Sequence, residues 1–117
     1  MQKTYQGGCH CGNVRYEVDL ELTNAISCNC SHCHKKGLLL AFAPAASFRT
    51  TVDESALTEY RFNKKVIAHL FCPTCGVQSY SRGKDQQGND TVAINLRCLD
   101  DIDVAALSVT PFNGKEY

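Results

Sequence analysis

The sequence predicts a mainly β protein built of antiparallel strands with little helix, in a single domain over residues 1–117. Three observations predict this fold class. Apolar and polar residues alternate with a period of two in several short segments, polar or glycine-rich turns separate these segments, and helical periodicity is scarce. The length of 117 residues fits one domain, and the hydrophobic content of 44% is typical of a packed protein.

The alternation places the expected strands along the chain. Val14, Tyr16 and Val18 alternate with polar residues and predict a strand over 14–18. The same reasoning, or a short continuous apolar run, predicts strands over 38–42, 58–62, 66–71 and 92–96, the last ending near Cys98. Turns are expected at 7–8, 63–65 and 83–90, and one short helical turn at 100–106.

The charge balance bears on the class of partner. Twelve Lys and Arg residues offset twelve Asp and Glu residues, which removes the usual electrostatic case for binding nucleic acid or an anionic membrane. A small-molecule partner fits better. The longest apolar stretch, 38–46, contains a proline and falls far short of the roughly 20 residues that span a bilayer. Since the first residues lack the apolar segment of a secretory signal, we expect a cytoplasmic protein.

The cysteines are the main chemical feature of the sequence. Seven of the eight fall in three tight clusters whose members are separated by one or two residues. Such close neighbours do not easily reach disulfide geometry, whereas they suit the ligand spacing of a tetrahedral metal ion. We therefore expect metal sites and no disulfide framework.

Two of the clusters predict a closed structural site. Cys72-Pro-Thr-Cys75-Gly76 has the spacing of a zinc knuckle, in which the proline fixes the bend and the glycine lets backbone amides approach the sulfurs. Cys9-His-Cys11-Gly is a tighter pair of the same kind. Together they supply four thiolates to one ion, which leaves no position for a substrate. Iron in a rubredoxin-like site is the alternative to zinc.

The third cluster predicts an open site. Cys28-Asn-Cys30-Ser-His-Cys33 places three thiols within six residues, and three protein ligands with an open fourth position are the pattern of catalytic zinc. The alternative is a second closed site completed by Cys98, His32 or His34. Cys98, at the end of an expected strand, fits a small buried residue better than a ligand.

Several polar residues are candidates for supporting roles. His34, just past the open cluster, is the best placed to carry a proton, whereas His10 and His32 are expected to point outward and His69 to be a hydrogen-bonded structural residue. The cations Lys35, Lys36, Arg15 and Arg82 could pair with carboxylates of an anionic ligand, with a solvated surface role as the alternative.

Three segments carry a resemblance to a known family. Residues 8–16 (GCHCGNVRY), 28–33 (CNCSHC) and 69–77 (HLFCPTCGV) resemble the signature segments of the glutathione-dependent formaldehyde-activating enzyme family, which includes centromere protein V. Residues 92–100 (VAINLRCLD) resemble the family's strand after the second knuckle, so the likeness covers about 4–113.

The resemblance implies a fold, two metals and a reaction. The fold is a zinc-bridged β-tent, with two zinc ions per chain: a structural zinc on Cys9, Cys11, Cys72 and Cys75, and a catalytic zinc on Cys28, Cys30 and Cys33. The implied activity is that of a carbon–sulfur lyase acting on glutathione and formaldehyde, with S-hydroxymethylglutathione formed or cleaved. A non-catalytic, zinc-stabilised glutathione carrier or interaction module is the alternative.

Overall fold

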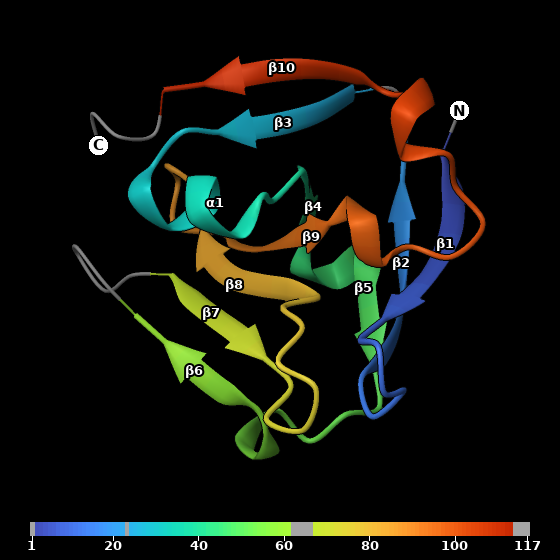
Figure 1. The fold of residues 1–117 in the computed structure, drawn as a ribbon, viewed down its shortest axis with the longest axis vertical. Coiled ribbons are helices and arrows are strands. Elements are labelled where there is room, and N and C mark those ends of the chain that lie inside the picture. Colours follow the sequence, from blue (N-terminus) through green and yellow to red (C-terminus); the bar gives the residue numbers. More distant parts are fainter. Residues whose placement is uncertain (1, 23, 62–66, 114–117) are drawn as a thin grey trace.

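The described part of the chain forms two β-sheets. The computed structural model describes residues 2–22, 24–61 and 67–113, in which ten strands fall into two sheets (Figure 1). The smaller sheet has the order β1 (Lys3–Gly8), β2 (Arg15–Leu20), β5 (Phe48–Thr50). The larger has the order β10 (Ser108–Phe112), β3 (Asn24–Cys28), β4 (Leu40–Pro44), β9 (Asp90–Asn95), β8 (Tyr80–Lys84), β7 (Ala68–Phe71), β6 (Thr58–Tyr60). Among the described residues, helix is confined to α1 (Ser31–Lys36) and short 3₁₀ turns, which confirms the mainly β prediction.

The strands predicted from alternation are found, with shifted ends. The strand expected over 14–18 is β2, and the strand expected over 92–96 is β9, which ends in a 3₁₀ turn over Leu96–Cys98. The run over 38–42 becomes β4, two residues later, and the predicted helical turn at 100–106 is a 3₁₀ turn over Val104–Ala106. Strands β6 and β7 lie within the predictions for 58–62 and 66–71. Phe62, Val66 and the turn expected at 63–65 lie outside the described residues.

Two turn predictions need correction. Gly7 and Gly8 were expected to form a turn but end strand β1, opposite Tyr16 and Arg15 of β2. Gly7 is needed there for close packing, because a Cβ atom would lie 2.7 Å from the carbonyl oxygen of Cys98. The turn predicted over 83–90 is shorter than expected, because β8 runs to Lys84 and β9 starts at Asp90.

One strand pair is parallel, which the expectation of antiparallel sheets missed. Strand β10 runs parallel to β3, with Ser108 opposite Asn24 and Phe112 opposite Cys28. A parallel neighbour requires a long return connection. Here the chain after β9 passes along β1, where the amide of Asp100 donates to the carbonyl of Gln6 at 2.8 Å, before it returns to β3. Figure 1 shows β10 and β3 side by side above α1.

The core lies between the two sheets. Three aromatic rings meet there: the ring centroid of Tyr16 lies 5.1 Å from that of Phe48 and 5.9 Å from that of Tyr80, and the centroids of Phe48 and Tyr80 are 4.7 Å apart. Val92 and Ile94 of β9 belong to the same core and are fully buried. Because side chains alternate along a strand, the neighbouring residues of the large sheet point to its outer face. That outer face carries α1.

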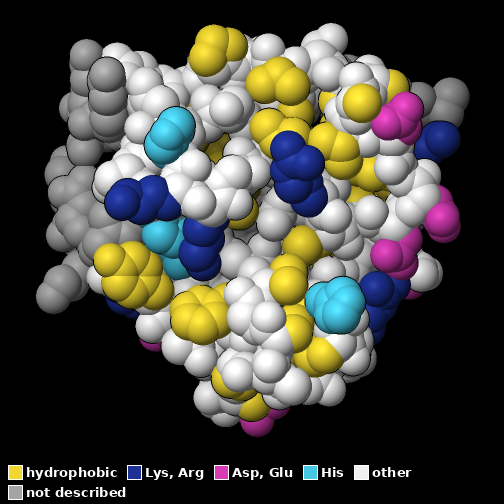
Figure 2. All heavy atoms as spheres, viewed as in Figure 1, with side chains coloured by type: hydrophobic (Ala, Val, Ile, Leu, Met, Phe, Trp, Pro, Cys, Tyr) yellow, Lys and Arg dark blue, Asp and Glu magenta, His cyan; other side chains and the backbone are white. Residues whose placement is uncertain are grey.

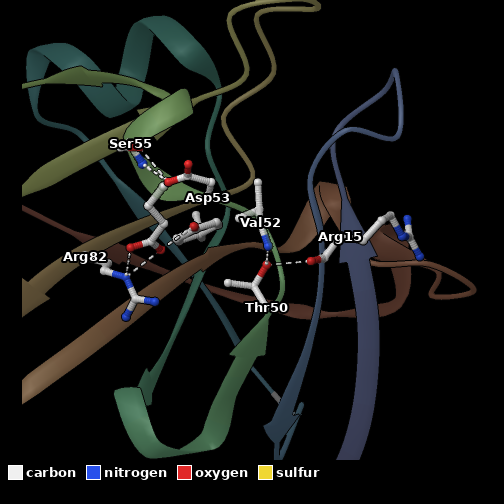
Figure 3. A network of polar contacts seen from close by, with 8 residues as sticks. Arg15, Thr50, Val52, Asp53, Ser55 and Arg82 are labelled. Carbon is white, nitrogen blue, oxygen red and sulfur yellow. Dashed lines mark hydrogen bonds and ion pairs between the residues drawn. The ribbon is translucent and has the colours of Figure 1, made fainter.

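Polar contacts hold the segment after β5 to both sheets (Figure 3). The hydroxyl of Thr50 donates to the carbonyl of Arg15 at 2.7 Å and accepts from the amide of Val52 at 3.2 Å. The guanidinium of Arg82 and the hydroxyl of Tyr80 both donate to the carboxylate of Glu54. In the described ranges, no helix has both the length and the apolar character needed to cross a membrane.

Candidate metal centres

The first cysteine cluster joins the two sheets. Cys9 and Cys11 lie in the connection from β1 to β2, whereas Cys72 and Cys75 lie in the connection from β7 to β8. The four Sγ atoms lie within 4.8 Å of one another, with 3.6 Å between those of Cys9 and Cys11 and 3.5 Å between those of Cys11 and Cys72. Four sulfurs around one zinc ion are about 3.8 Å apart, so the donor set fits a tetrahedral thiophilic ion.

Backbone amides shape this cluster as the knuckle spacing predicts. Gly76 adopts a φ of 80°, a left-handed conformation that favours glycine, and its amide donates to the carbonyl of Cys72 at 2.8 Å. The amide of Val14 donates to the sulfur of Cys9 at 3.3 Å. Backbone hydrogen bonds from Val77 and Cys11 lower the pKa of the Cys75 thiol to about 6, which favours the thiolate that a metal requires.

The second cluster is built at one end of β3 and the start of α1. Cys28 is the last residue of β3, Cys30 caps α1, and Cys33 lies in its first turn. Their sulfurs also lie within 4.8 Å of one another. The amide of Cys33 donates to the sulfur of Cys30 at 3.3 Å. Burial raises the pKa of Cys30, but hydrogen bonds from Cys33, Cys28 and the backbone of His32 together outweigh it, so that the net effect is a lowered pKa. Burial raises the pKa of Cys33.

No fourth ligand joins the second cluster in the described residues. Among the described residues, no further His, Cys, Asp or Glu side chain has a donor atom within 4.8 Å of all three sulfurs of Cys28, Cys30 and Cys33. Of the residues considered for a closed site, Cys98 instead directs its sulfur toward the carbonyl of Gln78, at 3.8 Å, and His34 is exposed. All eight cysteines are free of disulfides.

His32 does not point outward as the sequence predicted. Its ring lies 4.1 Å from the ring of His69 on β7 and 5.7 Å from that of Tyr60 on β6. Both partners come from other strands, so spacing within the cluster could not reveal the contact. His69 is buried, with 6% exposure, as expected of a structural residue. Burial, with repulsion from His32 and Lys36, lowers the pKa of His69 to about 4.

We predict that His69 stays neutral at pH 6. About three quarters of a histidine population with an ordinary pKa of 6.5 is protonated there. Because its folded pKa lies below the unfolded value, its contribution to stability is present above pH 6.5 and is lost as the pH falls toward 4. NMR chemical shifts of the imidazole nitrogens between pH 6 and 7.5 measure the protonation of His69, and the spectrum of His69→Gln identifies its signal. If the His69 signal of the folded protein titrated near pH 6.5, as we expect for the protein unfolded in urea, the burial argument would be wrong.

Basic side chains collect around α1. His34, Lys35 and Lys36 occupy its last turn, and none of its residues is acidic. The ammonium of Lys36 donates to the side chain of Gln78 at 2.7 Å and lies 5.0 Å from the ring centre of Phe71. The guanidinium of Arg97, which sequence analysis did not single out, donates to the carbonyl of Gly37 at 3.3 Å. Figure 2 shows Lys, Arg and His side chains gathered on this face and the acidic ones toward its margins.

Two other cations named from the sequence lie apart from this group. Arg15 forms an ion pair with Asp100, and Arg82 forms one with Glu54 at 2.8 Å. Both guanidinium groups therefore already have protein carboxylates as partners. Lys36 and its neighbours on α1 remain the cations placed next to the second cluster.

The two sheets and the two thiol clusters define a small β protein with two groups of cysteines that could each hold a metal ion. The sequence model of the glutathione-dependent formaldehyde-activating enzyme family matches residues 4–113, and the chain belongs to this family. The resemblance stated from the motifs is thereby confirmed. The family's name describes enzymes that activate formaldehyde in dependence on glutathione.

A solved structure is similar to this chain. The crystal structure of a Rhodobacter sphaeroides protein, a Northeast Structural Genomics target, matches it with a TM-score of 0.76 and 28% identity. The match covers 90% of this chain and 99% of the other.

Proposed function

We propose that this protein binds two zinc ions and forms or cleaves S-hydroxymethylglutathione, as a carbon–sulfur lyase. The single observation that carries the proposal is the difference between the clusters: four clustered thiols on Cys9, Cys11, Cys72 and Cys75, but three on Cys28, Cys30 and Cys33. Four thiolates complete a tetrahedron, whereas three leave one position for a ligand. The first cluster is then structural and the second is the substrate site.

A zinc ion in the second cluster would supply an open coordination position for a soft sulfur and would favour its thiolate form. Cys28, Cys30 and Cys33 would hold it there. The cluster is anchored on one side by Leu38 and Leu40, which bury Cys33, so the thiol of Cys33 has a fixed direction. Cys28 and Cys30 are only partly buried, and a substrate sulfur would approach from their side.

Cationic side chains on α1 and in the 3₁₀ turn after β9 support glutathione as the thiol. Glutathione carries two carboxylates, and the side chains of Lys35, Lys36 and Arg97 present positive charge near the cluster. Lys36 is held in place by Gln78 and Phe71 and so loses little side-chain freedom when it pairs with an anion. The protein would contribute mainly by holding the two reactants together.

The reaction needs one proton transfer and no redox partner. A carbon–sulfur bond forms between the glutathione sulfur and the carbonyl carbon of formaldehyde, and the proton lost by the thiol ends on the carbonyl oxygen. His34 is exposed on α1, four positions after Cys30, and its amide donates to the carbonyl of Cys30 at 2.9 Å. We assign the proton transfer to His34 or to a water molecule beside it.

Metal analysis and calorimetry test the proposal. The wild-type protein should hold two zinc ions per chain and bind glutathione, whereas Cys30→Ser should stay folded, hold one zinc ion and lose most of its glutathione affinity. S-methylglutathione, which lacks an ionisable thiol, should bind weakly to both. The matched control is Cys98→Ser, which removes a thiol outside both clusters. Iron would show itself by visible absorbance.

Exchange kinetics separate the enzyme from the alternatives. Line-shape measurements should show that the wild type speeds exchange between glutathione, formaldehyde and their adduct, and that Cys30→Ser does not. If glutathione binding depends on Cys30 but exchange matches buffer alone, the protein is a glutathione carrier. If glutathione and S-methylglutathione bind both proteins equally, sulfur does not reach the cluster and the mechanism is wrong. With no binding at all, a zinc-stabilised interaction module is the better description.

A further inference from the structure

An exposed aromatic side chain lies next to the second cysteine cluster. Phe112, on β10, is the register partner of Cys28 on β3, and paired residues of neighbouring strands point to the same face of a sheet. The amide of Asn29, the residue after Cys28, donates to the carbonyl of Phe112 at 3.1 Å. The side-chain amide of Asn29 also donates to Asn113 at 2.8 Å. The end of β10 is therefore fastened to the loop that carries the thiols, yet Phe112 keeps 45% of its surface exposed.

The exposed apolar surface is concentrated on this face. Phe42 of β4 pairs with Ala93, which packs against the apolar cluster that contains Cys33, and Tyr60 stacks on His32. Among the described residues, the large hydrophobic side chains that are exposed on the α1 face of the large sheet are Phe42, Tyr60, Ile67 and Phe112. In the described ranges, the remaining large hydrophobic residue that is exposed is Val109, which lies on β10 with its side chain on the opposite face. Hydroxymethyl, the group that formaldehyde adds to sulfur, has almost no apolar surface to place here.

We propose that the site also takes adducts of glutathione with larger, apolar aldehydes, whose hydrocarbon group lies against Phe112. The inference rests on the proposed function, because it places the sulfur at the second cluster. The chemistry is unchanged: a carbon–sulfur bond forms at the aldehyde carbon, the thiol proton moves to its oxygen, and nothing is oxidised or reduced. The hydrocarbon group is one bond from the carbon that bears the sulfur. It therefore falls beside Cys28, where Phe112 offers apolar surface.

Butanal and formaldehyde are the probes that test this inference. Each is added to glutathione in an excess that converts the thiol, the adduct fraction is measured by NMR, and the affinity for the zinc-loaded protein is measured by calorimetry per mole of adduct, with free glutathione as the reference. Covering part of a phenyl ring with a propyl group corresponds to about tenfold tighter binding of the butanal adduct. Phe112→Ala should abolish this preference and leave the affinity for the formaldehyde adduct unchanged, whereas Phe112→Leu should keep part of it. Aldehyde without glutathione corrects for reaction with lysines.

Val109→Ala is the matched control. It removes a side chain of similar exposure from the same strand, on the opposite face, and should leave the butanal preference intact. Equal affinity of the wild type for the two adducts would overturn the inference while leaving the proposed function standing. A preference that survives in Phe112→Ala, or is lost equally in Val109→Ala, would also overturn it. If neither adduct nor glutathione binds in a Cys30-dependent way, the proposed function fails first and the inference fails with it.

Discussion

Cys72→Ser should leave the protein largely unfolded at 25 °C. Cys72 is buried, and its sulfur lies 3.5 Å from that of Cys11, in the cluster that joins the two sheets. Structural zinc in small peptides contributes on the order of 10 to 16 kcal/mol, which is comparable to or larger than the whole free energy of unfolding of a typical domain. A serine hydroxyl does not replace a thiolate as a zinc ligand, so the sheets would lose the link between residues far apart in sequence.

Circular dichroism and amide exchange on three variants measure this effect. The thiol of Cys98 is partly buried and lies outside both clusters, so the free energy of unfolding of Cys98→Ser should lie within about 1 kcal/mol of the wild-type value. Cys30→Ser should also fold, because Cys28, Cys30 and Cys33 lie within one short segment and join no distant parts of the chain. Equal loss of structure in Cys30→Ser and Cys72→Ser would contradict the assignment of one cluster to folding and the other to substrate.

Tyr80→Ala should cost about 3 to 5 kcal/mol of the free energy of unfolding, as large-to-small aromatic substitutions in a core do. Tyr80 is 1% exposed, and its ring lies 5.9 Å from that of Tyr16 and 4.7 Å from that of Phe48. Removing the ring would leave a cavity at the place where the two sheets meet. Urea unfolding of the zinc-loaded protein gives the difference.

Tyr80→Phe separates packing from hydrogen bonding in this residue. It keeps the ring and removes only the hydroxyl that donates to Glu54. Since Glu54 still accepts from Arg82 at 2.8 Å, the loss should be about 1 kcal/mol. A loss as large as that of Tyr80→Ala would mean that the polar network, and not ring packing, holds this part of the core.

The grouping of the cysteines could be predicted from the sequence more completely than the arrangement of the strands could. Cysteine spacing identified all seven clustered thiols, because metal ligands in short motifs are set by local sequence. Alternation found β2, which is buried on one face and polar on the other, and β9, in which the fully buried Val92 and Ile94 alternate with less apolar residues. It missed β1, β3, β5, β8 and β10. The five residues of β10 are all exposed and include Pro111, so that no alternation marks this strand. Sequence analysis also missed α1, a six-residue helix too short for a periodic signal.

The contacts that sequence analysis missed around the site are all non-local. His32 meets His69 and Tyr60 from two other strands, and Phe112 reaches Cys28 through a parallel pairing that depends on the path of the preceding connection. The spacing of residues within one motif gives no information on contacts between residues that are far apart in the sequence. They become visible only when the order and direction of the strands are known.

The parallel docking of β10 gives the molecule a modular organisation. The thiols of the second cluster come from one short segment, whereas β10, the strand beside them, lies near the C-terminal end of the described chain. Backbone pairing with β3 and the hydrogen bond from Asn29 to Asn113 hold β10 in place. Backbone pairing tolerates many side chains. Residue 112 can therefore be substituted by every other amino acid, in a saturation library at one codon, without any change to the cysteine motifs or to the core residues.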